Sequence, residues 1–390
     1  MTNAAGEKSV RVAGSSGRPP AVAGVRRRLI DWYRRAARDL PWRRDPTPWN
    51  VWVSEIMLQQ TRVDTVIPYW SRFLARFPDP AALAAASEEE VLEAWSGLGY
   101  YRRARMLREG ARAVVERFGG EVPRADSDVR ALPGVGRYTA GAIRSIAHGE
   151  RAPLVDGNVA RVLSRVFGVA GDVSKAATAR VLWRIATDLV AEDVPGDVNQ
   201  AQMELGALVC LPNGAPRCEE CPLAELCVAR LENRIAELPQ LPPKRANVDV
   251  RRVVLLVTDA QGRVLLRRRR EDELLPGLWD LPGAFTGVGG DLSSDLGYAA
   301  SLLPFPVQAG EVLGTLRHAI TYRRISLEIR AAAPARDAAR AARGTDGAEL
   351  AWEAPLAAAA RALSSPARRI VTRWAGAPPR GPRADSGPRS

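Results

Sequence analysis

The sequence predicts two folded domains, an all-α domain followed by an α+β domain, and three observations support this. The chain has 390 residues, of which 46% are hydrophobic, and this length and composition suit more than one packed core. From Val25 to Leu231, apolar residues recur three and four positions apart, as in amphipathic helices. After a proline-rich segment, ELPQLPPKRANVD, the pattern changes to short β-rich runs.

Helical segments fill the first domain, which we expect to span residues 25–235. Four stretches carry the pattern clearly: VLEAW, ARMLREGARAVVERF, NVARVLSRVF and TARVLWRIATDLV. Gly and Pro separate the helices at FPDP, GLGYY, GGEVP and LPGVG. Before this domain, residues 1–24 are rich in Gly, Ser, Pro and Ala, and we expect them to be disordered.

Residues 236–247 form the expected linker, and the second domain is expected to span residues 248–376. It opens with two β-rich runs, VRRVVLLVT and VLLRRR, on either side of the glycine turn DAQGR. Further on, YRRISLEIRAAA alternates in the manner of a half-buried strand. Residues 377–390 form a basic tail that we expect to be disordered.

The charge of the chain favours a polyanionic partner. A net charge of +12 and a pI of about 10.2 suit nucleic acid, although a coding bias towards arginine would give the same balance. No apolar run reaches the roughly 18 residues of a membrane span. The N-terminal residues also lack the apolar core of a secretory signal, so we expect a cytoplasmic protein without a membrane partner.

The glycine turn LPGVG, at residues 132–136, directly precedes a helical run. Its glycines permit positive φ and a close backbone approach, and the unpaired N–H groups of the next helix can bind a phosphate. With flanking helices it would form a helix–hairpin–helix element at about 126–146; the alternative is a tight turn that binds nothing. Asp156 lies 22 residues past Gly134, and it or Asn158 could simply cap the following helix.

All four cysteines lie between Cys210 and Cys227, separated by seven, two and five residues. Disulfide scaffolds spread cysteines through a small secreted chain, so one tight cluster indicates a metal site. Zinc sites usually present two close pairs, and only one C-x-x-C, Cys218 to Cys221, occurs here. Four thiolates from one short loop favour an iron–sulfur cluster, with zinc as the alternative.

Together these motifs resemble those of the helix–hairpin–helix base-excision DNA glycosylases and, within that superfamily, the MutY family of adenine DNA glycosylases. The matching segments are LPGVGRYTAGAI, LVDGNVARVLSRVF, LPWRRDPTPWNVWVSEIMLQQTRVDTVIPYW and GLGYYRRARML, with the cysteine loop and the second domain. The likeness covers about residues 25–375. It implies a multidomain protein in which an all-α helix–hairpin–helix DNA glycosylase domain with an iron–sulfur loop at 210–227 precedes an α+β Nudix-like domain.

The resemblance also implies the cofactor. In the family this loop holds a [4Fe-4S] cluster, and the matching ligands are Cys210, Cys218, Cys221 and Cys227. The family's first cysteine gap is typically six residues, whereas here it is seven, LPNGAPR, in which Gly214 and two prolines could absorb the extra residue.

Two carboxylates carry the expected chemistry. Cleavage of an N-glycosidic bond builds positive charge on the sugar, and Asp156 is the candidate to stabilise it. Adenine leaves readily only when its ring is protonated, and the family's general acid matches Glu55. The apolar neighbours of Glu55 in VWVSEIMLQQT would raise its pKa; the alternative is a surface Glu in a salt bridge.

Tyr138 stands where related glycosylase/lyases carry a lysine. A lysine amine can form a Schiff base with the sugar aldehyde and a tyrosine cannot, so the resemblance implies base removal without an efficient lyase step. The alternative for Tyr138 is a packing aromatic, and we expect it both to pack and to line the pocket.

A base must leave the duplex to reach such a pocket. In the family a Gln and a Tyr fill or wedge the helix, and they match Gln60 and Tyr100; an Asn near the ribose matches Asn158. The hairpin residues Gly134, Val135 and Gly136 are the expected phosphate contacts. The alternatives are that Gln60 is an ordinary helix residue, that Tyr100 is an aromatic residue of a turn, and that Asn158 caps a helix.

The segment LLPGLWDLPGAF resembles the start of a Nudix-like fold. The following GAFTGVGGDLSSDLG has no Glu to hold Mg²⁺, so we expect no Nudix hydrolase activity. In the family this domain recognises 8-oxoguanine through a loop that reads Phe-Ser-His; the aligned residues are Leu316, Arg317 and His318, and only His318 matches. Arg317 could face a phosphate or a base edge, and His318 could be a polar strand-end residue.

The expected function is removal of adenine opposite 8-oxoguanine or guanine in double-stranded DNA, by a monomeric, monofunctional glycosylase of the bacterial cytoplasm and nucleoid. One alternative is a thymine-lesion glycosylase/lyase on the same scaffold, against which Tyr138 and the second domain argue. Another is a non-catalytic DNA-binding or redox-sensing iron–sulfur protein, against which the presence of both Glu55 and Asp156 argues.

Overall fold

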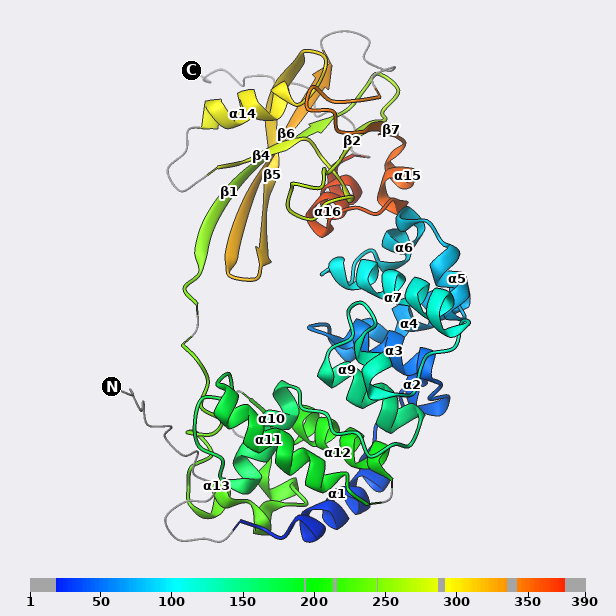
Figure 1. Cartoon of the computed structure of the whole chain (residues 1–390). Coiled ribbons are helices and arrows are strands. Elements are labelled where there is room, and N and C mark those ends of the chain that lie inside the picture. The colour runs from blue at the N-terminus through cyan, green and yellow to red at the C-terminus, as the bar shows by residue number, and fades with distance from the viewer. Residues whose placement is uncertain are drawn as a thin grey trace, which may run out of the picture. The chain divides into compact units, whose positions relative to one another are not determined.

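The computed structural model describes residues 19–192, 194–212, 216–243, 245–286, 292–334 and 342–375 (Figure 1). By their contacts the residues form two compact units, the first of residues 1–86 and 102–244 and the second of residues 87–101 and 245–390. The second unit therefore includes a piece of helical sequence that the expected domain boundary assigns to the first. No helix of the described part is long and apolar enough to cross a membrane.

The first unit is helical, as its periodicity predicts, and its described residues contain no strand. Its α-helices are α1 (Val22–Ala36), α2 (Pro41–Arg44), α3 (Pro48–Leu58), α4 (Val63–Arg76), α5 (Pro80–Ala85), α7 (Arg102–Phe118), α8 (Asp126–Arg130), α9 (Arg137–Ala142), α10 (Gly157–Phe167), α11 (Ala176–Leu189), α12 (Pro195–Leu208) and α13 (Val228–Leu231). A π-helical turn, Ile143–Ala147, follows α9, and short 3₁₀ turns lie at Cys218–Glu220 and Ala224–Leu226.

The N-terminal boundary differs from the expected one. Residues 1–24 were expected to be disordered, but Val22–Gly24 already belong to α1, so that expectation is wrong for these residues. The reason is that Val25, Leu29 and Tyr33 bury one face of α1 in the core, and the helix extends one turn further back. Residues 1–18 and the expected tail at 377–390 lie outside the described residues.

Two groups of helices make up this unit. In one, α1, α10, α11 and α12 surround a core that contains Leu29, Leu163, Leu189 and Leu205. In the other, α3 packs against α4, α7 and α9 and buries Trp52 completely. Each large side chain buried in this way contributes roughly 1.5–3 kcal/mol. This packing fixes the end of α3, the start of α10 and the middle of α12, and residues of all three line the cavity described below.

The second unit contains two sheets and four helices in its described residues. Its elements are α6 (Glu88–Trp95), β1 (Val248–Val257), β2 (Val264–Arg268), β3 (Trp279–Asp280), β4 (Gly283–Thr286), α14 (Leu292–Ser301), β5 (Val307–Ile320), β6 (Arg323–Pro334), β7 (Leu350–Glu353), α15 (Pro355–Ala360) and α16 (Ser365–Trp374). The larger sheet has the order β4-β1-β6-β5, with β1 and β6 parallel and the outer pairs antiparallel. The smaller sheet is antiparallel, in the order β3-β2-β7.

The predicted strands VRRVVLLVT, VLLRRR and YRRISLEIRAAA are confirmed as β1, β2 and β6. On β1, Val254 and Leu256 enter a core shared with α15 and α16, whereas Leu255 and Val257 enter a core shared with α14. A strand buried on both faces reads as a continuous apolar run, which explains the sequence of β1.

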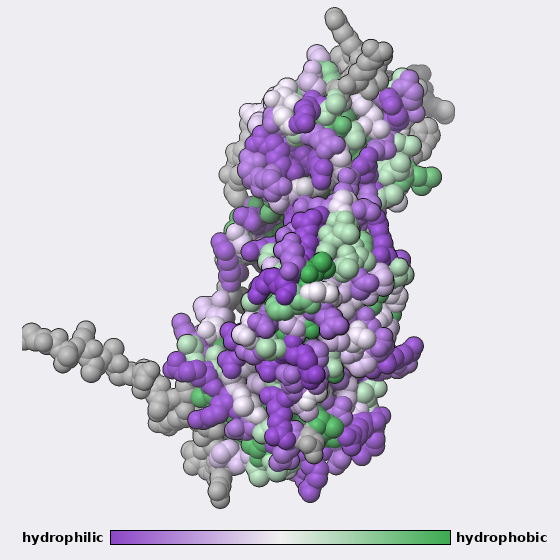
Figure 2. Space-filling model, turned by 45° about the vertical axis from the view of Figure 1, so that its right-hand side comes forward, coloured by the Kyte–Doolittle hydropathy of each residue, from purple (hydrophilic) through white to green (hydrophobic). Residues whose placement is uncertain are grey.

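Hydrophilic side chains dominate the face drawn in Figure 2.

Candidate active site

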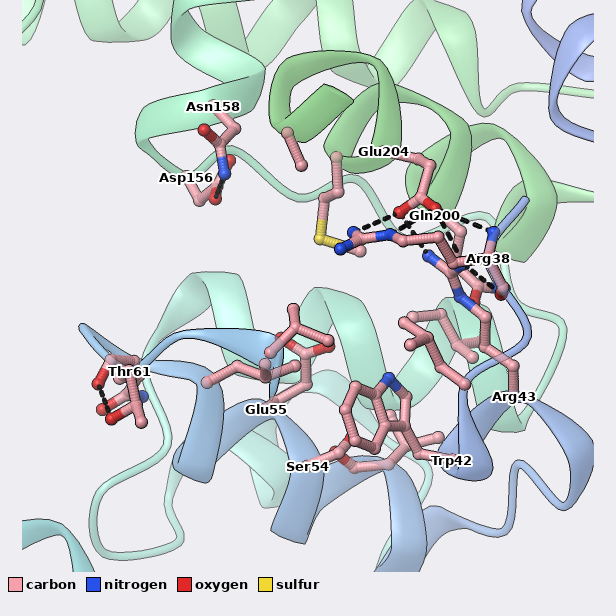
Figure 3. Close-up of a pocket in the computed structure, with 18 of the residues that line it drawn as sticks. Arg38, Trp42, Arg43, Ser54, Glu55, Thr61, Asp156, Asn158, Gln200 and Glu204 are labelled. Atoms are coloured by element: carbon pink, nitrogen blue, oxygen red, sulfur yellow. Dashed lines mark hydrogen bonds and ion pairs between the residues drawn. The ribbon is translucent and has the colours of Figure 1, made fainter. Parts of the chain in front are cut away.

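A cavity of about 550 Å³ in the first unit brings together residues that are far apart in the sequence (Figure 3). Five predicted site residues line it: Glu55 of α3, Gln60 just after α3, Tyr138 of α9, and Asp156 and Asn158 at the start of α10. Asp156 and Asn158 lie together across the cavity from Glu55 (Figure 3). The structure therefore places both predicted carboxylates on one cavity.

Glu55 is held by a helix that is well defined at its start. The Thr47 hydroxyl accepts the Asn50 N–H at 3.2 Å and caps α3, with Pro48 at the first helical position. Glu55 is only 5% exposed, so the surface-Glu alternative is wrong. Burial raises its pKa to about 7; a hydrogen bond from the Tyr138 hydroxyl to Oε2, 2.6 Å long, opposes that rise. The pKa lies near neutral pH, in the direction that the apolar neighbours predict.

Asp156 both caps a helix and lines the cavity. One oxygen, Oδ1, accepts the Val159 N–H at 2.7 Å, which is the capping bond that the alternative reading anticipated. The other, Oδ2, lies 3.4 Å from Nδ2 of Asn158. Burial raises the pKa of Asp156 above its ordinary value, and the backbone hydrogen bonds and the charge of Arg161 only partly offset that rise. Capping therefore orients the carboxylate and leaves its second oxygen for the cavity.

Arg161 connects this carboxylate with the cysteine loop. Its Nη2 donates to Oδ1 of Asn158 and its Nε donates to the carbonyl of Cys210, each at 2.8 Å. The next turn of α10 brings Arg165, whose Nη1 lies 3.3 Å from Sγ of Cys210. Both arginines are buried, so α10 carries two fixed positive charges from the cavity to the loop.

Tyr138 packs against the core of the first unit and lines the cavity, as expected. Its hydroxyl also lies 3.1 Å from Sδ of Met203. Burial, reinforced by the charges of Glu55 and Asp156, raises the pKa of Tyr138 well above its ordinary value. The phenol is therefore a neutral hydrogen-bond donor, and no lysine is found among the described residues that line this cavity.

The sequence did not indicate a second group of cavity residues. Glu204 of α12 accepts from Arg38 Nε at 2.8 Å and Nη2 at 2.7 Å, and from Arg43 Nη2 at 3.0 Å (Figure 3). Burial would raise the pKa of Glu204, but these hydrogen bonds outweigh it and lower the pKa to about 2. Arg43 Nε also donates to Gln200 at 3.1 Å. About 160 residues separate Glu204 from the two arginines, so short-range spacing in the sequence could not predict that they line one side of this cavity together.

The helix–hairpin–helix element consists of α8, the turn at 131–136 and α9. Gly134 needs to be glycine: its φ is +78°, and a Cβ there would lie 2.8 Å from Cβ of Met106. Gly136 has a φ of −90° and open space around it, so the conformational argument fails at that position. The Val135 side chain is buried at 7% exposure, which leaves only its backbone for a ligand.

Gln60 and Tyr100 share an unusual backbone. Both residues are exposed, and both have a left-handed backbone conformation, with φ of +58° at Gln60 and +48° at Tyr100. The turn of Gln60 is held by Arg103, whose Nη1 donates to the carbonyls of Ile56, Met57 and Gln59 at 2.8, 2.9 and 2.5 Å. Tyr100 belongs to the second unit.

The four cysteines lie along one pocket of the first unit, beside Arg165. Cys210 follows α12, Cys218 begins a 3₁₀ turn that Cys221 directly follows, and Cys227 precedes α13. No three His, Cys, Asp or Glu side chains of the described residues converge on one ion position. Within the first gap, LPNGAPR at 211–217, residues 213–215 lie outside the described residues, and so does the part of the expectation that concerns Gly214.

The predicted lesion loop is not a loop in the structure. Leu316, Arg317 and His318 lie within β5, where Leu316 pairs with Leu327 and His318 with Ile325 on β6. Leu316 is buried in the core, Arg317 is exposed, and His318 is partly buried. Burial and the charge of Arg369 lower the pKa of His318. The expectation of a loop is wrong because strand pairing continues to Ile320.

Family models match two parts of the chain. Residues 53–187 match the HhH-GPD superfamily of base excision DNA repair proteins, and residues 253–373 match the NUDIX domain.

Individual relatives agree with these matches. The chain is 39% identical over 373 residues to an adenine DNA glycosylase of Rattus norvegicus, covering 80% of this chain and 72% of the relative. It is 52% identical over 218 residues to an adenine DNA glycosylase of Homo sapiens, covering 54% of this chain but only 40% of that relative. Among solved structures, a thermostable thymine-DNA glycosylase superposes with a TM-score of 0.50 at 28% identity, covering 54% of this chain and 97% of that one.

Proposed function

The chain belongs to the adenine DNA glycosylase family of base excision repair, and we propose from its site that it hydrolyses the N-glycosidic bond of adenine paired with 8-oxoguanine or guanine. The observation that carries this proposal is the pairing of Glu55 and Asp156 on one cavity, with only Glu55 almost fully buried. Two carboxylates in different environments can serve as an acid and as a carboxylate stabiliser in one reaction.

Glu55 is the proposed general acid. A carboxyl with a pKa of about 7 is protonated in about half of the molecules at neutral pH, and it can release its proton to a ring nitrogen of adenine without a large penalty. The Tyr138 hydroxyl then stabilises the carboxylate that remains, because its hydrogen bond to Oε2 strengthens when Glu55 is ionised. Protonation makes adenine a better leaving group.

Asp156 is the proposed stabiliser of the sugar. As the bond to adenine breaks, positive charge develops on the sugar, and Asp156 lines the cavity in which the sugar would lie, with its Oδ2 outside the capping bond. Asn158 lies beside that oxygen and is itself held by Arg161, so the pair is preorganised. Attack by water completes the hydrolysis and leaves an abasic site.

The reaction should stop at the abasic site. Strand cleavage through a Schiff base needs an amine, and Tyr138 supplies a hydroxyl in its place. This observation favours a monofunctional glycosylase over the glycosylase/lyase alternative.

We also propose how the duplex is held. Gln60 and Tyr100 would fill and wedge the helix when adenine leaves the stack, and the backbone of Gly134, Val135 and Gly136 would bind phosphate. In the second unit, the exposed Arg317 and the partly buried His318 are the residues proposed to contact 8-oxoguanine.

A [4Fe-4S] cluster fits the cysteine pocket. All four cysteines line one pocket of the first unit, and four thiolates from one short loop suit such a cluster. Cys210, Cys218, Cys221 and Cys227 would hold it, and the bound cluster would order the loop.

The direct test uses duplexes with one adenine opposite 8-oxoguanine or guanine, under single-turnover conditions, with and without hot alkali. Strand breaks that appear only after alkali are expected, because alkali cleaves abasic sites. Breaks without alkali would indicate a lyase, and intact binding without breaks in either case would indicate a non-catalytic protein.

A further inference from the structure

The loop that carries Tyr100 has a strained backbone. Within four residues, Gly97, Gly99 and Tyr100 adopt φ values of +107°, +72° and +48°. Glycine takes these values freely, but tyrosine takes them only where its surroundings fix the chain. The Tyr100 side chain is 43% exposed. Something other than local preference must therefore hold this loop, at residues 96–101, in shape.

Trp95 Nε1 of α6 donates to the carbonyl of Gly99 at 3.2 Å, and further contacts come from α16 and the residues just before it. Tyr101 is buried, and its hydroxyl donates to the carbonyl of Leu363 at 3.1 Å while it accepts the Gly97 N–H at 3.3 Å. The Ser96 hydroxyl lies 3.4 Å from the same carbonyl and accepts from Arg368 Nη2 at 2.6 Å. Both ends of the loop are thus tied to residues 363–368.

The helix before the loop is tied to the same region. Glu89 of α6 accepts from Trp279 Nε1 at 3.2 Å and from Arg361 Nη1 at 2.8 Å. Arg368 Nη2 also donates to the carbonyl of Arg361 at 2.9 Å, which joins the two sets of contacts. Residues 87–101 therefore form one compact unit with the C-terminal part of the chain, although they fall inside the helical family match at 53–187.

We propose that residues 361–368 of the Nudix-like region position the loop that opens the duplex, so that this region supports adenine excision even where no 8-oxoguanine is present. Tyr101 and Arg368 are positioning residues, because each acts on DNA only through the conformation of Tyr100. This inference rests on the proposed function, in particular on Tyr100 as the wedge.

The test compares two duplexes, one with adenine opposite 8-oxoguanine and one with adenine opposite undamaged guanine. The full chain is assayed with Tyr101→Phe and Arg368→Ala, with Tyr298→Phe and Arg373→Ala as matched controls. Tyr298 and Arg373 are exposed side chains on α14 and α16. Single-turnover excision and the fluorescence of 2-aminopurine placed beside the mispair report catalysis and duplex opening.

Tyr101→Phe and Arg368→Ala should each lower the excision rate and the fluorescence rise about 5- to 30-fold. This is the loss expected when a buried hydrogen-bond partner is left unpaired. The factor should be similar on both duplexes, and the controls should match the wild type. In a Tyr100→Ala background, Tyr101→Phe should cost less than about twofold, because the two changes act through one element. Exchange of the Gly97 amide should also be faster in Tyr101→Phe.

A loss confined to the 8-oxoguanine duplex would overturn the inference, because the contacts would then serve lesion recognition alone. An additive loss in the Tyr100→Ala background would overturn it as well, and so would unchanged Gly97 exchange with unchanged excision. Absence of excision by the wild-type chain on both duplexes would instead contradict the proposed function. The two failures are therefore distinguishable.

Discussion

Replacement of Glu55 by Gln should stabilise the first unit at pH 8 and leave its stability at pH 4 almost unchanged. The reason is that folding raises the pKa of this carboxyl from 4.5 to about 7 by burial. Below pH 4.5 the carboxyl is mostly neutral in both the folded and the unfolded chain, so the destabilisation that depends on its ionisation is almost absent. Between pH 4.5 and 7 only the unfolded chain ionises, and stability is lost progressively; above pH 7 the loss is complete.

The size of the effect follows from the shift. A rise of about 2.5 pKa units, at about 1.4 kcal/mol for each unit, destabilises the wild-type fold by about 3 kcal/mol at pH 8. Glutamine keeps the shape of the side chain, stays neutral at both pH values, and its Oε1 can accept the Tyr138 hydroxyl. The variant should therefore recover most of this free energy of unfolding at pH 8.

The assay is urea unfolding of the wild type and of Glu55→Gln at pH 4 and pH 8, followed by helical circular dichroism. The exposed Glu109→Gln on α7 serves as the control and should change stability little at either pH. The same Glu55→Gln protein should lose excision about 10²- to 10⁴-fold, because it lacks the proposed acid. Equal stabilisation at both pH values would refute the reasoning, since packing rather than titration would then be responsible. Destabilisation at pH 8 would refute it too.

Three further predictions follow from the site. Tyr138→Phe removes the hydroxyl that stabilises ionised Glu55, so the alkaline fall in excision should move up by about one pH unit; a move to lower pH would contradict that role. Asp156→Asn should fold, because Asn also caps helices, and should bind mispaired duplex but release almost no adenine; near-normal turnover would remove Asp156 from the mechanism. Cys221→Ser should lose iron and sulfide from the purified chain, and an unchanged iron content would exclude Cys221 as a ligand.

Periodicity predicted the regular elements that build the molecule. The runs that became α7, α10 and α11 place apolar residues three and four apart, and β6 alternates with Ile325, Leu327 and Ile329 buried. These patterns succeed because burial of one face is a local property of spacing. The expected start of the domain, at Val25, lies three residues inside α1, because a helix continues as far as backbone hydrogen bonding allows, beyond the residues that are buried.

The resemblance to the adenine DNA glycosylases also indicated Glu55, Tyr138 and Asp156 as candidates, because each stands in a segment that matches the family's motifs. It did not indicate Glu204, Arg38 and Arg43, which form the wall of the same cavity. Their side chains meet only because α12 packs against α1, and Arg38 and Arg43 follow α1 in the sequence. A charged residue whose partner lies about 160 positions away looks like any surface charge until the fold pairs the two.

The sequence by itself determined which segments are helical or extended and where the cysteines gather, because these depend on residue type and short-range spacing. Its resemblance to a family indicated Glu55 and Asp156 as candidates for the chemistry. Only the tertiary structure decided that Glu55 is buried with a pKa of about 7, that Asp156 caps α10 and faces the cavity at once, and that residues 87–101 belong with the C-terminal part of the chain. Burial and long-range hydrogen bonds are properties of neighbours in space, and one-dimensional spacing does not record them.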